Sequence, residues 1–211
     1  GYAKNYHRIF CRESFELNGR FYGPWWVNAK GTVRRQILID GEETVSLDFK
    51  AMNPHLLYSM AGTPYSDVYK DGDPYRLEGY DKESRDARKF CFLVAINSES
   101  RGQTIKVVHW KAAEKKVKIG EIDVGKALDD LYAKHTSIRE WIYTDSALKL
   151  ANQEAKVTET ILEALIEREI PALNVHDEFI VGKQHEGTVR QVMIHSYQSH
   201  GLTSLPDIKV S

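Results

Sequence analysis

The sequence predicts an α+β domain built around an antiparallel sheet. Two short runs, Thr44–Leu47 and Phe179–Val181, are rich in the β-branched and aromatic residues that are typical of strands. Stretches with apolar residues at helical spacing lie between and after these runs. The 211 residues are enough to bury one core, so we expect one domain with a subdomain and not two full domains.

An acidic residue lies at one end of each strand run. Asp48 directly follows Thr44–Leu47, and Asp177 lies in the segment Val175–Glu178, just before Phe179. We expect this segment to form a hairpin turn, although surface hairpins usually carry Asn-Gly or Asp-Gly at the turn. A carboxylate held on rigid strands is suited to bind a metal ion or to act as a general base. The alternative is a surface hairpin with incidental charges.

The segment between these acids is predicted to form a helix from Asp81 to Asn97, with Asp81 as its N-cap. Arg85, Arg88 and Lys89 are three and four residues apart, so on a helix they share one face. Such a patch can bind a polyphosphate, with bidentate contacts from arginine and a point charge from lysine. The alternative is a solvated basic face, which is what most charged runs form.

The order of acid, basic helix and acid makes the chain similar to the family A DNA polymerases. By this resemblance, Asp48 is the first metal-binding aspartate, and the main-chain carbonyl of Phe49 is a ligand beside it. Arg85 and Lys89 match the Arg-x-x-x-Lys of the fingers helix, which grips the triphosphate of the incoming nucleotide. Asp177 matches the second metal-binding aspartate of the family.

The resemblance also implies a cofactor and substrates. Phosphoryl transfer requires positioning and charge neutralisation, and two Mg²⁺ ions held by Asp48 and Asp177 would supply both, with Mn²⁺ as a substitute. Mg²⁺ prefers oxygen ligands and keeps several waters, so two carboxylates and the substrate phosphates are enough. Lys89 and Arg85 would offset charge on the leaving pyrophosphate, and Arg88 would help to bind the nucleotide. The expected partners are a nucleic acid primer and template and nucleoside triphosphates.

Further contacts are expected around the two aspartates, within a resemblance that spans roughly residues 18–185. Glu178 would support a metal ion or orient its water, with an exposed structural role as the alternative. Arg20 and His176 would contact the primer. Gln153, on a later helix, would face the primer or the template.

Three positions depart from the family pattern. Asn53 and Asn97 stand where the family has a Glu and a Tyr that screen the sugar, and Leu93 replaces an aromatic residue. The stretch that begins at Asn53 also resembles the single-subunit phage-type RNA polymerases, so the choice between deoxyribonucleotides and ribonucleotides stays open. Asn53 has a structural interpretation too, because Asn followed by Pro is a good N-cap and first-turn pair for a helix over residues 54–61.

The rest of the chain is predicted to form helices over residues 128–143, 146–168 and 188–199, and an edge strand over residues 207–210. The implied architecture is a polymerase palm over residues 1–63 and 123–211, whose antiparallel sheet carries both aspartates. Residues 64–122 would form a small helical, fingers-like insertion. No thumb or exonuclease domain is evident, so a thumb or accessory domain outside this chain is an expected partner.

The composition indicates an intracellular protein. Cys11 and Cys91 lack metal-type spacing and are expected to be reduced thiols, and no long apolar run predicts a membrane segment. The formal net charge is −1, so basic charge is local and is concentrated between Arg101 and Lys118. That segment would follow a nucleic-acid backbone or form an exposed amphipathic insertion. Trp25 and Trp26 would stack on bases or anchor the core.

The leading functional hypothesis is a template-directed nucleotidyltransferase that extends a primer, with DNA synthesis favoured. An RNA polymerase or primase-like enzyme on the same palm is the close alternative. A palm that has lost catalysis and only binds nucleic acid is a second alternative. A nuclease would also use paired acids, but the basic helix would then have no purpose.

Overall fold

The computed structural model describes residues 4–70, 72–81, 84–114, 119–120 and 122–211. The chain forms two compact units. Unit 1 consists of the residues up to Ser59 together with Lys149–Ser211, and unit 2 consists of Met60–Leu148. Unit 1 is therefore discontinuous in sequence, and unit 2 is an insertion within it.

An antiparallel sheet with β4 (Glu42–Phe49) at its centre forms the framework of unit 1. β6 (Glu178–Gly182) pairs with β4 along one edge, and β5 (Ala172–Val175) pairs with β6. Two short strands share the other edge of β4. β3 (Leu38–Ile39) pairs with its beginning, and β7 (Ile208–Val210) pairs with its last three residues. The predicted antiparallel sheet and C-terminal edge strand are thus confirmed.

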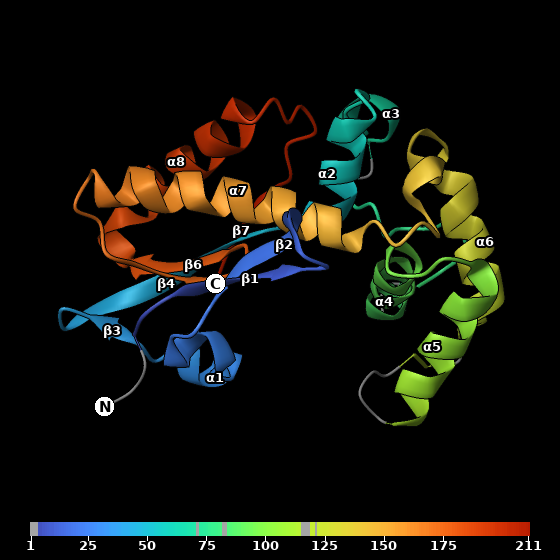
Figure 1. Cartoon of the computed structure of the whole chain (residues 1–211), viewed down its shortest axis with the longest axis horizontal. Coiled ribbons are helices and arrows are strands. Elements are labelled where there is room, and N and C mark those ends of the chain that lie inside the picture. Colours follow the sequence, from blue (N-terminus) through green and yellow to red (C-terminus); the bar gives the residue numbers. More distant parts are fainter. Residues whose placement is uncertain (1–3, 71, 82–83, 115–118, 121) are drawn as a thin grey trace. The chain divides into compact units, whose positions relative to one another are not determined.

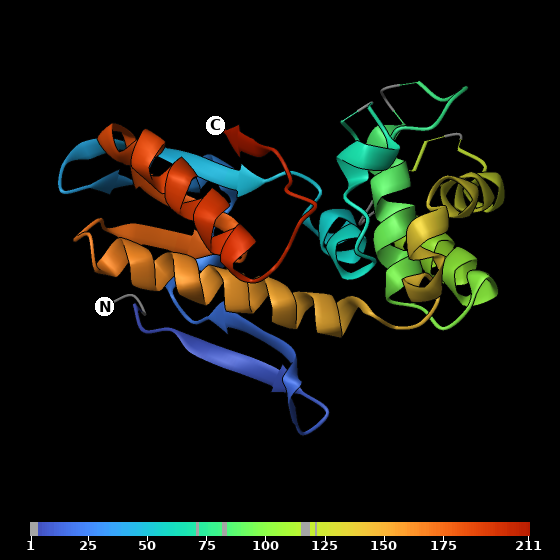
Figure 2. The ribbon, with the colours of Figure 1, turned by 90° about the horizontal axis from the view of Figure 1, so that it is seen from above.

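Helices α7 (Ala147–Ile166) and α8 (Glu186–Ser199) cover one face of this sheet (Figures 1 and 2). Successive side chains of a strand point to opposite faces, so alternate residues of β4 face these helices. The Phe49 ring packs against Tyr197 of α8, with 5.6 Å between the ring centroids. Asp48, the preceding residue, therefore belongs to the opposite face of the sheet.

An N-terminal hairpin of β1 (His7–Cys11) and β2 (Ser14–Tyr22) is attached to α7. The Nδ2 group of Asn152, on α7, donates hydrogen bonds to the carbonyls of Phe15 at 2.8 Å and Asn18 at 2.9 Å. The remaining helices that begin in unit 1 are η1 (Trp25–Asn28), α1 (Gly31–Arg34), α2 (Met52–Met60) and η3 (Lys183–His185).

Unit 2 is helical where the structure describes it. Its elements are α3 (Tyr65–Val68), α4 (Arg85–Ile96), α5 (Arg101–Ala113), α6 (Val124–Lys134) and η2 (Thr136–Trp141). α4 packs against both α5 and α6. Phe92, Val108 and Leu128, one from each of these helices, are buried in the core between them.

Most of the predicted helices are present, with different boundaries. The helices expected over residues 146–168 and 188–199 are confirmed as α7 and α8. The helix expected over residues 128–143 is instead two elements, α6 and η2. Because α6 packs against α4, it belongs to unit 2, so the insertion ends at Leu148 and not at residue 122.

Two predicted helix caps are wrong. α4 begins at Arg85 with Ser84 as its N-cap, and Asp81 lies outside it, where Oδ1 accepts the Ser84 N–H at 2.7 Å. α2 begins at Met52, so Asn53 lies inside that helix and does not cap it. The chain turns from β4 into α2 at Ala51, where φ is +53°.

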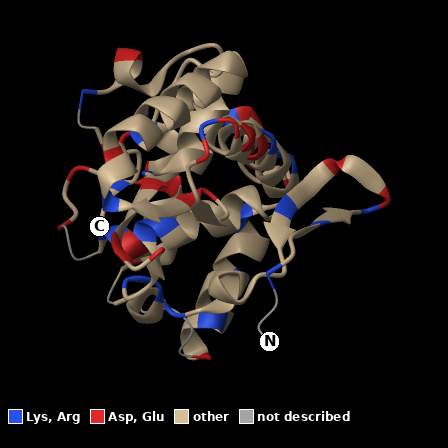
Figure 3. Cartoon of the chain, turned by 90° about the vertical axis from the view of Figure 1, so that its left-hand side faces the viewer, with Lys and Arg blue, Asp and Glu red and all other residues tan. Residues whose placement is uncertain are grey.

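Basic and acidic residues are interspersed along the ribbon (Figure 3), in keeping with the formal net charge of −1. Both cysteines are free, and burial raises the pKa of the Cys91 thiol to about 11. No helix among the described residues is both long and apolar enough to cross a membrane.

Candidate active site

The two predicted metal-binding aspartates lie at neighbouring strand ends in unit 1. Asp48 of β4 is opposite Glu178 of β6 in the antiparallel register. His176 and Asp177 form the two-residue turn between β5 and β6, so Asp177 directly precedes Glu178. Because residues opposite each other in a sheet share a face, the carboxylates of Asp48 and Glu178 lie on the same face.

A cavity of about 400 Å³ opens at this end of the sheet. Both aspartates line it, together with three basic residues, Arg34, Arg35 and Lys209. Its other lining residues are Gly31, Val175, His176, Glu178 and Ser211. The cavity thus combines two carboxylates that could bind cations with side chains that could bind phosphate.

The carboxylate of Glu178 is held by two neighbours. Ser46 donates its hydroxyl to Oε1, and Nη2 of Arg34 lies 3.0 Å from Oε2. Each oxygen therefore has a protein donor and keeps a further lone pair, so the expected role of Glu178 in supporting a metal ion stays a prediction. The Arg34 charge also reduces the repulsion between Glu178 and Asp48, since like charges directly opposite in a sheet are destabilising.

His176 adopts an uncommon backbone conformation, with φ of +58° at the first central position of the turn. Type II′ hairpin turns usually place glycine there. The His176 carbonyl accepts hydrogen bonds from Thr158 Oγ1 of α7 at 3.1 Å and from Asn174 Nδ2 at 3.3 Å. Two side chains thus fix the turn that carries Asp177, which is where strain at a functional site would be expected.

The imidazole of His176 lies among cations and against an aromatic ring. Its centroid is 5.4 Å from that of Tyr22 in an edge-to-face arrangement. Burial, and then the charges of Arg20 and Arg34, lower the pKa of His176 from its ordinary value. These effects favour the neutral form of the imidazole, and the expected primer contact of His176 stays a prediction.

Arg20 and Glu154 form an ion pair beside the aspartates. Nε and Nη2 of Arg20 donate to the two carboxylate oxygens of Glu154 at 2.6 and 2.5 Å, and only 2% of the Glu154 side chain is exposed. Burial, followed by the negative charge of Asp177, raises the pKa of Glu154 to about 7, and Asp48 adds to this effect. The three carboxylates therefore form one electrostatic group.

Sequence reasoning missed Glu154. The available signal was its place on the inner face of α7, four residues before Thr158 and one turn after Ala151, both of which are buried. An acid on a buried face requires a partner, because burying an unpaired carboxylate is costly. The partner, Arg20, comes from a strand 134 residues earlier, so the spacing along the chain did not reveal the pair.

The donor set fits a site for divalent ions of the Mg²⁺ type. Asp48 and Asp177, which both line the cavity, would be the protein carboxylates, although no group of three or more His, Cys, Asp or Glu side chains among the described residues is placed to hold a metal ion. Ser46 and Lys50 direct main-chain groups toward the β7 side of β4. Main-chain groups alternate along a strand, so the carbonyl of Phe49 points to the other side, toward Asp177.

Three buried polar atoms around this site have no hydrogen-bond partner within the described part of the chain. They are Nε of Arg34, Oδ1 of Asn174 and Nδ1 of His176. Buried polar atoms in native proteins nearly always have a partner, which is often water or a ligand. Arg34 and His176 line the cavity, whereas Asn174 is fully buried beside it in the chain.

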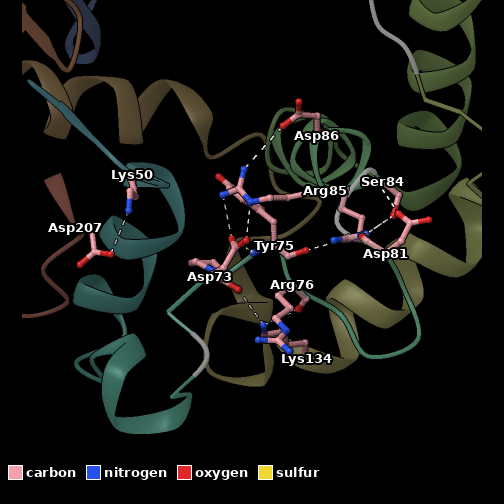
Figure 4. A network of polar contacts seen from close by, with 12 residues as sticks. Lys50, Asp73, Tyr75, Arg76, Asp81, Ser84, Arg85, Asp86, Lys134 and Asp207 are labelled. Atoms are coloured by element: carbon pink, nitrogen blue, oxygen red, sulfur yellow. Dashed lines mark hydrogen bonds and ion pairs between the residues drawn. The ribbon is translucent and has the colours of Figure 1, made fainter. Parts of the chain in front are cut away.

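All of the predicted nucleotide-binding residues except Asn53 lie on α4 or at its C-cap in unit 2. Four of them, spaced four residues apart, lie on the unburied face of the helix, namely Arg85, Lys89, Leu93 and Asn97. Asn97 donates Nδ2 to the Leu93 carbonyl at 2.7 Å. Nε and Nη2 of Arg85 contact the carboxylate of Asp73 at 2.6 and 3.1 Å (Figure 4).

Arg88 does not share this face, which corrects the expectation of a patch of three cations. Its side chain is 2% exposed, and its guanidinium donates to the carbonyls of Tyr75 at 2.8 Å and Asp81 at 3.1 Å. Its Nη1 also donates to the Ser84 hydroxyl. Arg88 therefore binds the segment that precedes α4 and is not available to a nucleotide.

The other residues that the sequence singled out differ in their exposure and contacts. Gln153 is partly exposed on α7, and Asn53 is partly exposed on α2. Trp26 is buried and donates Nε1 to the Asn174 carbonyl at 3.3 Å, so it anchors the core. Arg101 forms an ion pair with Asp129 at 2.6 Å. The other end of the predicted basic segment, Lys115, Lys116 and Lys118, lies outside the described residues.

In fold, the chain is similar to the structure described as the POL domain of Pol1 from M. smegmatis in complex with DNA primer-template and dNTP, with a TM-score of 0.50 and 12% sequence identity. The similarity covers 98% of this chain and 46% of that one, so this chain spans about half the length of the polymerase domain that it matches. No protein-family model and no curated protein matches the sequence. The α+β fold with an antiparallel sheet therefore resembles that of a polymerase domain.

Proposed function

We propose that this chain is the catalytic module of a template-directed nucleotidyltransferase related to the family A DNA polymerases, with deoxynucleoside triphosphates as the favoured substrates. One observation carries the proposal. Asp48, near the end of β4, and Asp177, in the turn before β6, line one cavity in a fold similar to that of a polymerase domain. A basic helix with Arg85 and Lys89 is inserted between them in sequence, in the order that the family has.

Asp48, Asp177 and the main-chain carbonyl of Phe49 would hold Mg²⁺ or Mn²⁺. When bound, a pair of such ions stabilises the attacking and leaving oxygens of phosphoryl transfer. The protein's own contribution is to hold the two carboxylates on rigid strand ends. Thr158 and Asn174 fix the turn of Asp177, and the paired strands fix Asp48.

The other residues of the site would position the nucleic acid and the nucleotide. His176, neutral and close to Tyr22, and Arg20, oriented by Glu154, would contact the primer end. Lys89 and Arg85 would bind the triphosphate and offset the charge that develops on the leaving pyrophosphate. Glu178 would keep Arg34 at the cavity wall.

The selection between deoxyribonucleotides and ribonucleotides depends on other residues. Asn53 and Asn97 stand at the positions where the resembled family screens the sugar. Asn53 is partly exposed on α2 and Asn97 is exposed at the end of α4, so both amides are accessible. An RNA polymerase or primase-like activity is therefore the second candidate function.

The test is extension of a labelled primer on a DNA template with Mg²⁺, run in parallel with dNTPs and with rNTPs. We expect product from the wild type, more with dNTPs, and a loss of at least about 10³-fold in rate for Asp177→Asn, since removing a group that stabilises transition-state charge typically costs 10² to 10³ or more. Equal activity of wild type and Asp177→Asn would refute the two-carboxylate mechanism. Retention of labelled DNA without any product would instead identify a binding module.

A further inference from the structure

The guanidinium of Arg85 is fixed on one edge and on one face. Asp73 contacts the edge, with 2.6 Å from Nε to Oδ2 and 3.1 Å from Nη2 to Oδ1. The ring of Tyr75 covers a face, since the central guanidinium carbon lies 5.3 Å from the ring centroid. Figure 4 shows the contact with Asp73 at the start of α4. A side-on carboxylate contact of this kind defines the plane of a guanidinium as well as its position.

The segment that carries Asp73 is itself held in place. Oδ1 of Asp73 accepts the main-chain N–H of Tyr75 at 3.1 Å, and buried Arg88 donates Nε to the Tyr75 carbonyl at 2.8 Å. Lys134 of α6 donates Nζ to the Arg76 carbonyl at 2.7 Å and to the Asp73 carbonyl at 3.3 Å (Figure 4). Two helices of unit 2 thus fix the carboxylate, so Asp73 is a rigid support for Arg85.

The opposite edge of Arg85 is open. Its Nη1 makes no hydrogen bond to any residue that the structure describes, and Oδ1 of Asp86, whose side chain is 93% exposed, lies 3.9 Å from it. A guanidinium has five N–H donors, and Asp73 uses only two of them. Lys89, one helical turn further along, is exposed on the same face of α4.

We propose that Asp73 is a positioning residue that orients the open edge of Arg85 toward the phosphates of the nucleoside triphosphate; this inference rests on the function proposed above. In this arrangement the two cations of α4, Arg85 and Lys89, contribute differently to phosphate binding. Asp73 offsets the charge of Arg85, so Arg85 supplies directed hydrogen bonds, whereas exposed Lys89 supplies most of the net positive charge.

The test is the Asp73→Asn variant, with Asp86→Asn as the matched control, since each removes one carboxylate close to Arg85. Asparagine at position 73 keeps an acceptor for the Tyr75 N–H but loses the charge that orients the guanidinium. We expect the KM for the nucleotide in primer extension to rise roughly tenfold for Asp73→Asn with a smaller change in kcat, and to change less than about twofold for Asp86→Asn. Thermal melting of both variants controls for folding.

A double-mutant cycle makes the inference specific to Arg85. In an Arg85→Lys background, lysine cannot form the bidentate contact, so Asp73→Asn should then leave KM nearly unchanged. Additive effects of the two substitutions, or a lower KM in Asp73→Asn, would overturn the inference, because Asp73 would then act independently or compete with the phosphates. Absence of product and of nucleotide binding in the wild type would overturn the proposed function itself, and the positioning role with it.

Discussion

At the scale of single residues, three acids of unit 1, Asp48, Asp177 and Glu178, line the cavity at one end of the sheet. Asp48 faces Glu178 across two paired strands, and Asp177 is adjacent to Glu178 in sequence. Arg34 offsets Glu178, and Arg20 offsets Glu154 on α7. Both aspartates line the cavity, together with Arg34, Arg35 and Lys209, and the negative charge of each raises the pKa of Glu154.

At this scale the sequence revealed the residues that end strands but not their supports. Asp48 and Asp177 follow and precede runs with clear strand composition, so their positions could be predicted. Glu154 and Asp73 could not, because each is defined by an arginine partner that only the folded chain brings near. Arg88 was misassigned because helical spacing alone does not tell which cation faces the core, and a long side chain can reach inward to backbone carbonyls.

His55 provides a pH-dependent contribution to stability. It is buried in α2 with Nδ1 at 3.0 Å from Ser204 Oγ, and burial lowers its pKa from 6.5 to about 4. Between those values the unfolded chain binds a proton that the folded chain does not, so this residue destabilises the fold as pH falls. From 1.36 kcal/mol per pKa unit, the loss between pH 7 and pH 5 is about 2 kcal/mol. Glu154, with a raised pKa, acts in the opposite direction over the same window.

We therefore expect His55→Gln to change how the free energy of unfolding depends on pH, and not only its value at one pH. Urea denaturation at pH 7 and pH 5 should show the variant gaining about 2 kcal/mol relative to wild type on acidification. His109→Gln, on the exposed side of α5, is the control and should follow the wild-type slope. Parallel slopes for His55→Gln and wild type would mean that His55 titrates normally in the folded protein.

At the scale of elements, α7 joins the parts of unit 1. It binds the N-terminal hairpin through Asn152, Arg20 of β2 through Glu154 and the turn between β5 and β6 through Thr158. Its length and apolar face were predictable from the 3.6-residue period. The polar contacts of Asn152, Glu154 and Thr158 were not predictable, because their partners are far away in sequence.

The packing of α7 can be tested with two isoleucines of the same helix. Ile161 is fully buried, whereas 74% of Ile166 is exposed. Ile161→Ala should lower the free energy of unfolding by about 2–5 kcal/mol, from lost burial and the cavity left behind, and Ile166→Ala by less than about 0.5 kcal/mol. Chemical denaturation of both variants measures the difference. Similar losses would contradict this assignment of the core, because alanine has the higher helix propensity and Ile166 is exposed.

At the scale of the whole molecule, the two groups of candidate ligands belong to different units. Unit 1 holds the candidate metal ligands on a sheet, and unit 2 holds the candidate triphosphate ligands on a helix. The order of motifs predicted this division, because a family resemblance specifies which motif belongs to which subdomain. The boundary near residue 122 was not predictable from pattern, since the apolar face of α6 could have packed against either unit.

This division leads to a prediction about unit 1 in isolation from unit 2. Replacing Met60–Leu148 with a flexible Gly/Ser linker of about 15 residues leaves both aspartates, their strands and the cavity residues in the chain. If unit 1 holds the ions alone, Mn²⁺ at ten times its Kd should stabilise the linker variant by about 1.4 kcal/mol.

Thermal melting with and without Mn²⁺ measures this stabilisation, and nucleotide binding by the same variant should be lost because Arg85 and Lys89 are gone. Asp177→Asn in the linker background is the control, since it keeps the turn but removes the charge that would bind the ion. A linker variant that is folded by circular dichroism yet gains nothing from Mn²⁺, while the full chain does, would show that unit 2 supplies part of the metal site. The two-carboxylate assignment would then be incomplete, because Mg²⁺-type ions would require oxygen ligands that unit 1 does not contain.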